Sequence, residues 1–363
     1  MKEAQSAKGS DVHCNALAER GRGRHVPPGA VPNDRERNVN RTMSKVFARA
    51  IASVVLGLGA TGCALAAGFP ERRIEIVVPV TPGSATDLLA RMVAEKLSER
   101  VSQPVIVANK PGAASKIGAD YVKRSAADGY TLLVIHSGIM ANPYAYKAFD
   151  LDLRKDFTYI VPLTWTPWVV AVHSELPVKS IADLVAYGKA NPGKLNFGTT
   201  GGSSELDVRM LMQRAGIDGE LLLYPGGTQV LTALASNEIQ VALNAIRGVE
   251  SLRGRGVTAI AVTSPRRFAL APEIPTVGES GVPGFRGASL WFGLLGPAGM
   301  PRDVVEKLNR EVNGILAMPD VVKRVTAMAH EVIGGSSEDF RKFAFDELDG
   351  YERTAREARL EPR

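Results

Sequence analysis

The sequence predicts an α/β protein with two similar lobes and a cleft between them. The first observation is that short β-rich runs alternate with segments whose apolar residues recur at helical spacing, which is typical of α/β units on a largely parallel sheet. The second is that this alternation occurs in two successive series. Because ligands of open α/β sheets bind beyond the carboxyl ends of the strands, two such lobes facing each other would enclose a binding cleft.

The first series occupies the region from residue 73 to residue 135. A β-rich run at 73–79 opens it, and a helix is predicted at 86–101, where leucine, methionine and valine recur at helical spacing. Predicted strands at 104–108 and 130–135 flank a predicted helix at 116–125. This order favours parallel pairing of the three strands.

The second series contains more strands and ends in two long helices. The last helix has Ser336 and Ser337 as candidate N-caps, with Glu338 and Asp339 in its first turn. The predicted strands lie at 168–173, 195–199, 221–224, 239–243, 260–262 and 290–295, and the predicted helices at 181–190, 204–215, 230–236, 301–316 and 337–358.

The charge distribution argues against a polyanionic partner. The chain has 363 residues, a length that favours two domains over a single core. Its net charge is +6, from 44 Lys and Arg against 38 Asp and Glu. Residues 1–66 hold ten basic and five acidic residues, so the remainder holds 34 and 33 and has a net charge of +1. The excess of basic residues therefore lies mostly in residues 1–66, and we expect no nucleic-acid partner.

The first 66 residues are expected to be a leader rather than part of the fold. Residues 1–42 are polar and lack hydrophobic periodicity, which indicates a disordered tail or a start site assigned too early. Residues 43–66 have the basic start, apolar core and small-residue cleavage site of a signal peptide. The alternative is a lipid anchor at Cys63, although Ala60 stands where a lipoprotein signal has Leu or Val. We therefore expect export through a cleavable signal peptide.

The residue inventory argues against an enzyme and against a metal or other cofactor. Both cysteines, Cys14 and Cys63, lie in the leader, so the mature chain would have no disulfide, thiol nucleophile or thiolate ligand. No HExxH, paired-histidine metal spacing or GxSxG pattern occurs. A dyad of His136 with Ser137 is weak, because adjacent strand residues point to opposite faces. An exported α/β hydrolase, which would need a nucleophile–base pair, is the rival interpretation.

Four loops that follow predicted strands are rich in glycine and hydroxyl residues. They lie at 82–87, 136–138, 198–204 and 224–228. Glycine lets the backbone approach a ligand closely, and hydroxyl and helix-terminal N–H groups suit a carboxylate or a phosphate. No loop has the Walker or the GxGxxG spacing. The alternative is that the first loop is an ordinary turn in which Thr86 or Asp87 caps the next helix, and that 198–204 is a flexible glycine turn.

The sequence resembles the Bug receptors, the solute-binding proteins of tripartite tricarboxylate transporters, over residues 69–360. The resemblance rests on several blocks that occur in the family's order. They are PVTPGSATD at 79–87, NKPG at 109–112, DGYTLL at 128–133, AVTS at 261–264 with Arg267, IPTVGESG at 274–281 and WFGLLGPAGMP at 291–301.

This resemblance implies a type II periplasmic-binding-protein fold, in which two α/β lobes are joined by crossing hinge strands. Lobe 1 would combine residues 69–167 with 289–363, and lobe 2 would be residues 168–288. The strands at 168–173 and 290–295 would cross between them. The ligand would be a small mono-, di- or tricarboxylate, an acidic amino acid or an aromatic acid. We expect a periplasmic monomer whose partners are the membrane subunits of a tripartite tricarboxylate transporter, the alternative being a sensor kinase of a two-component system.

The resemblance also assigns ligand contacts to the four loops. The first loop would hold one end of the ligand, with the loop at 136–138 beside it. Hydroxyl groups in lobe 2 would grip a carboxylate without a fixed cation, and the loop at 224–227 would add backbone contacts. The candidate ligand-binding residues are Thr81, Gly83, Ser84, Thr86, Asp87, Ser137, Gly138, Thr199, Thr200, Ser203, Ser204, Glu205, Tyr224, Gly226, Gly227 and Asn244.

Three candidate residues depart from the family pattern. Ser84 stands where a second glycine is common, Glu205 where histidine is common, and Asn244 where aspartate is common. If Glu205 faced the cleft, it would repel a second carboxylate or pair with an amino group. It could equally face solvent at the start of its helix, where acidic side chains are favoured, and we expect this second placement.

Overall fold

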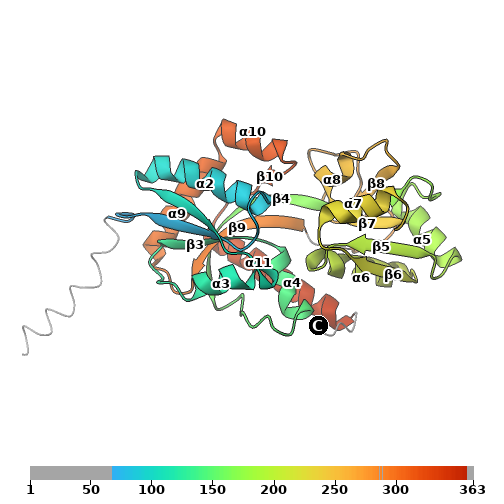
Figure 1. Ribbon diagram of the computed structural model, residues 1–363, viewed down its shortest axis with the longest axis horizontal. Helices are drawn as coiled ribbons and strands as arrows, with labels where there is room; N and C mark the ends of the chain where they lie inside the picture. The colour runs from blue at the N-terminus through green and yellow to red at the C-terminus, as the bar shows by residue number, and fades with distance from the viewer. Residues whose placement is uncertain (1–67, 286, 288, 358–363) are drawn as a thin grey trace, which may run out of the picture. The chain divides into compact units, whose positions relative to one another are not determined.

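The computed structural model describes residues 68–285, 287 and 289–357 (Figure 1). The predicted tail at 1–42, the signal peptide at 43–66 and the lipid anchor at Cys63 lie outside these residues.

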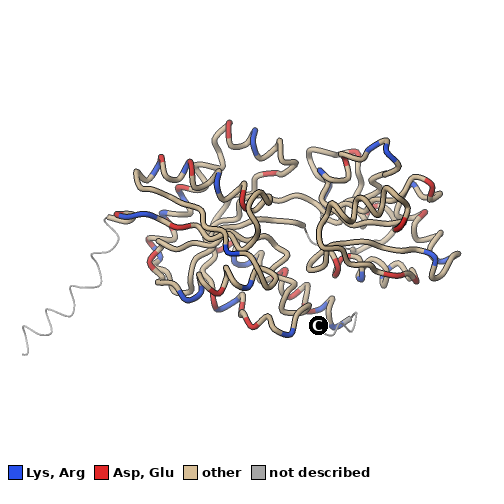
Figure 2. Tube along the Cα trace, in the orientation of Figure 1, with Lys and Arg blue, Asp and Glu red and all other residues tan. Residues whose placement is uncertain are grey.

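The surface charges of the described part are mixed in sign. Figure 2 shows acidic and basic residues interspersed along it, in line with the small net charge predicted beyond the leader. None of the helices in this part is both long and apolar enough to cross a membrane.

Parallel strands form the first part of the sheet. The central strand β1 (Ile74–Val78) pairs in parallel with β2 (Val105–Asn109) and with β3 (Thr131–His136). A strand covered on both faces reads as a continuous apolar run, and four of the five β1 residues are buried. The helical segments of this part are α2 (Ala85–Val101), the short 3-10 turn η1 (Ala113–Ser115), α3 (Lys116–Lys123) and α4 (Gly138–Ala145).

A single long strand, β4 (Phe157–His173), belongs to both parts of the sheet. Up to Pro167 it pairs antiparallel with β9 (Ser289–Pro297), and from Trp168 onward it pairs with β7 (Val241–Ala245) and β8 (Val257–Val262). Only the half from residue 168 was predicted as a strand. The half before residue 168 was not predicted, because it contains Pro162 and Pro167 and proline normally argues against a central strand.

The second part of the sheet repeats the parallel arrangement. β5 (Leu195–Thr199) pairs in parallel with β6 (Gly219–Leu223) and with β7, so the carboxyl ends of these three strands lie at one edge. The order of the main path is β2-β1-β3-β9-β4-β7-β5-β6, with β8 and β10 (Glu331–Val332) pairing with β4 off this path. The helices of this part are α5 (Ile181–Ala190), α6 (Ser203–Ala215), α7 (Gly227–Ala235) and α8 (Ile246–Glu250).

Three C-terminal helices complete the described fold: α9 (Arg302–Leu316), α10 (Pro319–Ala327) and α11 (Ser337–Glu357). α9 packs beside α2 over β4, and both helices bury an apolar face, with Leu89 and Leu308 among the buried residues. Ser336 Oγ accepts the N–H of Asp339 at 3.0 Å, which confirms Ser336 as the cap of α11.

The helices α4, α8 and α10 were not predicted. α4 contains Pro143, which is unfavourable in a helix interior. α8 has only five residues, too few to show helical periodicity. α10 follows α9 after Ala317 and Met318, and starts with Pro319 at its first position.

Hydrogen bonds to the carboxylate of Glu331 connect β10 with the segment that follows β8. Its carboxylate accepts hydrogen bonds from Trp165 Nε1 at 3.0 Å, Arg266 Nη2 at 2.8 Å and Ala269 N at 2.7 Å. Arg266 also lies over the ring of Trp165, at 4.3 Å from its centroid. The partly buried Glu331 therefore joins groups that lie far apart in the sequence.

Glu331→Ala is expected to lower the free energy of unfolding by about 2 kcal/mol, because a buried indole N–H and a backbone N–H lose a charged acceptor. Urea denaturation measures this change. The control is Glu250→Ala, which removes a more exposed pair with Arg253 and is expected to cost about 0.5 kcal/mol. Equal losses in the two variants would contradict this role of Glu331.

Candidate functional site

The candidate loops lie at two sheet edges that approach each other at the starts of α4 and α6. Since β1 and β3 are parallel neighbours, the loops that follow them share one edge. The loops after β5 and β6 share the corresponding edge of the second part, together with the end of β7. A Cβ atom placed on Gly202 would lie 3.6 Å from the carbonyl oxygen of Gly138. The loops at 136–138 and 198–204 are therefore in contact range (Figure 1).

In the first loop, Ser84 rather than Thr86 or Asp87 caps α2. Ser84 Oγ accepts the N–H of Asp87 at 3.3 Å. The predicted cap at Thr86 or Asp87 is wrong because both residues lie inside the helix and both are buried. Thr81 and Gly83 are exposed in the preceding turn, where Gly83 has a φ of 83°.

Asp87 holds this loop in place. Its buried carboxylate accepts hydrogen bonds from Gly83 N at 2.9 Å, Arg91 Nε at 3.0 Å and Asn109 Nδ2 at 2.8 Å. Burial alone would raise the pKa of Asp87, but these hydrogen bonds outweigh it and lower the pKa below the ordinary value of 3.8. Asp87 is therefore ionised at neutral pH, and we assign it to positioning the loop rather than to contacting an anion.

Ser137 directs its hydroxyl toward β9. The fully buried hydroxyl donates to the Ser289 carbonyl at 2.9 Å and accepts the N–H of Trp291 at 3.3 Å. Gly138 N donates to His136 Nδ1 at 3.1 Å, and burial lowers the pKa of His136 to about 4. The imidazole is thus neutral at pH 7, with Nδ1 as the acceptor. His136 and Ser137 fix the start of α4 through separate partners.

A hydroxyl network shapes the loop between β5 and α6. Thr199 Oγ1 donates to Ser204 Oγ at 2.6 Å, and Ser204 Oγ donates to the Gly201 carbonyl at 2.9 Å. Thr200 Oγ1 lies 3.4 Å from Ser204 Oγ, and Thr200 is exposed. Ser203 is buried at the first position of α6. The structure therefore brings the predicted hydroxyl residues together, with Thr200 as the exposed member.

The loop after β6 is fixed by its own hydrogen bonds. Tyr224 N donates to the Thr199 carbonyl and Tyr224 Oη to Glu238 Oε1, each at 2.9 Å. Burial and the Glu238 carboxylate raise the pKa of Tyr224 to about 12. Asn244 Nδ2 donates to the Gly227 carbonyl at 2.8 Å, and Asn244 Oδ1 accepts Ala245 N at 2.8 Å. The side chains of Tyr224 and Asn244 are therefore engaged within the protein, and they position the start of α7.

The predicted solvent-facing placement of Glu205 is wrong. Glu205 is only 7% exposed, and its Oε1 accepts Arg209 Nη2 at 2.9 Å and Nε at 3.2 Å. The arginine stands one turn further along α6, so its guanidinium reaches back to the carboxylate. Glu205 is held by a cation on its own helix.

Three helices begin at the candidate loops without a side-chain cap. The N-cap residues of these helices, Ser137, Gly202 and Gly226, make no side-chain cap hydrogen bond, although the first N–H of α4, that of Gly138, donates to His136 Nδ1. By contrast, Ser84 and Ser180 cap α2 and α5. Unpaired N–H groups at a helix N-terminus, together with the helix dipole, favour an anion. The arrangement can therefore hold a carboxylate through neutral donors.

The site also depends on residues that the sequence patterns did not identify. Asn109 bonds both Asp87 and the Val80 carbonyl, and Ser289 anchors the hydroxyl of Ser137. Asn109 lies in the NKPG block, which was noted without a role, whereas nothing in the sequence around Ser289 indicates one. Among the residues that the structure describes, no group of three or more His, Cys, Asp or Glu side chains could hold a metal ion.

A sheet whose two parts share long strands, with glycine- and hydroxyl-rich loops at the carboxyl ends of the parallel strands, is the architecture of solute-binding proteins of the periplasmic-binding type. The chain belongs to the tripartite tricarboxylate transporter family of receptors, whose model, TctC, matches residues 89–360. This confirms the family and the fold class predicted from the sequence.

A curated relative and two solved structures support the same assignment. Protein BugT of Bordetella pertussis is 31% identical over 300 residues, which cover 80% of this chain and 90% of BugT. The structure of R. palustris Rpa4515 with adipate has 30% identity and a TM-score of 0.71, covering 81% of this chain and all of that one. MatC from Rhodopseudomonas palustris with bound malate has 28% identity and a TM-score of 0.67, covering 79% of this chain and all of that one.

Proposed function

We propose that this protein is a periplasmic receptor that captures a small carboxylate between two lobes. Lobe 1 is residues 69–167 with 289–363, and lobe 2 is residues 168–288. The change of strand partners in β4 between Pro167 and Trp168 supports this boundary. Relatives with bound adipate and malate support the ligand class.

The observation that most directly supports this proposal is the approach of Gly202 to Gly138 at the starts of α6 and α4. It brings the starts of two helices close together, and the N-cap residues of both make no side-chain cap hydrogen bond. A carboxylate there accepts hydrogen bonds from both lobes, so its binding favours the closed form. The membrane subunits of a tripartite tricarboxylate transporter then recognise the closed receptor.

The receptor role includes no catalysis. An exported hydrolase would need a nucleophile activated by an adjacent base. The adjacent His136 and Ser137 do not form such a pair, because Ser137 Oγ donates to the Ser289 carbonyl and His136 Nδ1 accepts the N–H of Gly138.

A thermal-shift panel tests the ligand class. The purified protein is heated with mono-, di- and tricarboxylates, acidic amino acids and aromatic acids, and each hit is measured by calorimetry. Because a ligand that binds only the folded state stabilises it by mass action, at least one carboxylate should raise Tm in a concentration-dependent way. A panel without any saturable carboxylate ligand would contradict the proposal.

Tryptophan fluorescence is expected to report closure. Trp168 is the first β4 residue that pairs with β7, and its buried indole N–H has no hydrogen-bond partner. Closure around this junction should change its surroundings and therefore its emission. Trp168→Phe should remove most of the ligand-induced change, whereas Trp291→Phe should retain it. A signal that survives in the Trp168 variant would argue against movement at this junction.

A further inference from the structure

A cavity lies between α11 and the paired strands β4 and β9. Its volume is about 550 Å³, which is within the range of small-molecule sites. The residues that line it come from β4, β9, β10, α11 and the segment that follows β8. None of these described residues belongs to the four candidate loops, so this β4–β9 cavity is separate from the candidate carboxylate site.

Aromatic rings form the buried side of the β4–β9 cavity. Trp165 on β4 and Trp291 on β9 are paired across the two strands, and both line the cavity. Phe340 and Phe343 of α11 meet the ring of Trp291 edge to face, with ring centroids 5.4 and 5.7 Å away. Because aromatic edges and faces have opposite partial charges, a surface of this kind accepts a further planar ring in the same arrangement.

The rim of the cavity leaves two large apolar side chains in contact with solvent. Ile333, which follows β10, is 40% exposed, and Phe343 on α11 is 42% exposed. Removing such apolar surface from water is favourable, and neighbouring exposed apolar side chains mark a ligand-binding groove or another interaction site. A ligand that covers both side chains therefore gains free energy at the rim as well as inside the cavity.

The charged groups beside the cavity already have partners. Arg266 Nη2 donates to Glu331 Oε2 at 2.8 Å, and the guanidinium lies over the ring of Trp165. Asp339, the carboxyl-bearing residue among those that line the cavity, accepts Ser336 Oγ at 2.6 Å. An ion bound here would lose hydration without meeting an unpaired opposite charge. Charge complementarity therefore favours a neutral occupant.

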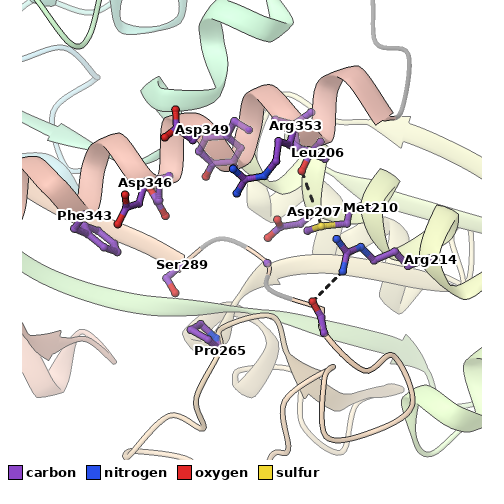
Figure 3. A pocket seen from close by; sticks show the side chains of 16 residues that line it. Leu206, Asp207, Met210, Arg214, Pro265, Ser289, Phe343, Asp346, Asp349 and Arg353 are labelled. Carbon is purple, nitrogen blue, oxygen red and sulfur yellow. Dashed lines mark hydrogen bonds between the residues drawn. The ribbon is translucent and has the colours of Figure 1, made fainter.

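A neighbouring cavity between α6 and α11 has a different character (Figure 3). Pro265, Ser289 and Phe343 line both cavities. The wall of the neighbouring cavity includes charged residues such as Asp346 and Arg353, and no tryptophan is among its described lining residues. The aromatic surface is therefore specific to the β4–β9 cavity, and variants can separate the two.

We propose that the β4–β9 cavity binds a neutral, planar aromatic compound of one or two rings. The ring lies against Trp291 and Phe343, and Ile333 covers it from the rim. Pro265 belongs to proposed lobe 2 and Phe343 to proposed lobe 1, so the bound compound contacts both. The protein then binds a second class of small molecule, at a site that does not depend on the carboxylate.

The test uses indole as the neutral planar probe. Tryptamine has the same ring system with a positive charge, and cyclohexanol is neutral but not planar. Calorimetry of the purified protein at pH 7 measures the three affinities. We expect saturable binding of one indole per chain with a Kd of about 1 mM or lower, and at least about fivefold weaker binding of the other two. Absence of saturable indole binding, or equal binding of tryptamine or cyclohexanol, would overturn the proposal.

Variants locate the bound indole. Phe343→Ala should weaken indole binding about fivefold and Ile333→Ala about threefold, and both proteins should fold, because the two side chains are partly exposed. The controls are Ile117→Ala, which removes a 53% exposed side chain on α3, and Arg353→Ala, which alters the neighbouring cavity. Both should bind indole within about twofold of the wild-type protein. An equal loss in either control, or unchanged binding in both test variants, would refute the assignment. These outcomes do not involve carboxylate binding, so the proposal can fail independently of the receptor function.

Discussion

Gly202→Val is expected to weaken carboxylate binding about 100-fold. Gly202 precedes α6 with a φ of 63° and a ψ of −133°, a backbone conformation that costs a side-chain-bearing residue about 1 to 3 kcal/mol. That cost alone corresponds to roughly 5- to 150-fold in affinity if the loop must adopt this conformation to bind. The branched side chain would also start 3.6 Å from the Gly138 carbonyl oxygen, in the gap where the two lobes are proposed to meet. Calorimetry with the best carboxylate of the panel measures the effect.

The matched control is Gly254→Val. Gly254 also has a positive φ, of 76°, and a Cβ there would meet nothing within 4 Å. The substitution also places a branched side chain at a positive φ, so the variant should lose stability, and it should keep its affinity for the carboxylate. Equal losses of affinity in the two variants would show that Gly202 acts only through general stability.

Asp87→Ala is expected to lower the free energy of unfolding by about 3 kcal/mol and to weaken carboxylate binding. The substitution removes a buried acceptor of three hydrogen bonds, those from Gly83, Arg91 and Asn109. Losing a charged partner leaves buried donors unsatisfied, and each such bond is worth about 1.5 to 3 kcal/mol. Arg91 is half exposed and can be solvated, so we count only the bonds from Gly83 and Asn109, whose lower values sum to about 3 kcal/mol.

Asp183→Ala is the matched control for this prediction. Asp183 occupies the same position after its cap: Ser180 Oγ accepts its N–H at 3.1 Å, and its carboxylate accepts Lys179 N at 3.0 Å. These bonds are exposed, so the loss should be about 1 kcal/mol, with no change in carboxylate affinity. A loss at Asp183 as large as that at Asp87 would contradict the role given to burial and to Asn109.

The same carboxylate gives a pH dependence. The pKa of Asp87 is lowered in the folded state, so its contribution to stability is fully present above the ordinary value of 3.8. It is lost as the pH falls through the folded-state pKa. The stability difference between the wild-type protein and Asp87→Ala, measured by urea denaturation, should therefore shrink below about pH 4.

Local patterns predicted most of the fold, and the misses have physical causes. β5 and α5 agree with the predicted ranges, because a β-rich run and a helical periodicity are each bounded there by clear turn residues. The first half of β4 was missed because Pro162 and Pro167 occur in it, although both lie in a strand that pairs with β9. Tertiary pairing, which no local pattern encodes, overrides the local preference at these positions.

The sequence located the candidate loops but not the directions of their side chains. Ser137 is predicted to contact the ligand, and its hydroxyl donates to the carbonyl of Ser289 in β9, 152 residues further along the chain, a partner that the sequence did not indicate. Glu205 was expected in solvent, and Arg209 covers it. Loop composition predicts which groups are available, whereas their partners come from segments that only the fold brings together.

A crystal structure of the protein with the best carboxylate of the panel tests the central claim most directly. The account predicts that a ligand carboxylate accepts N–H groups at the start of α6, with the loop containing Ser137 and Gly138 against its other side. A saturating carboxylate bound away from these loops, for example in the cavity between α6 and α11, would contradict it.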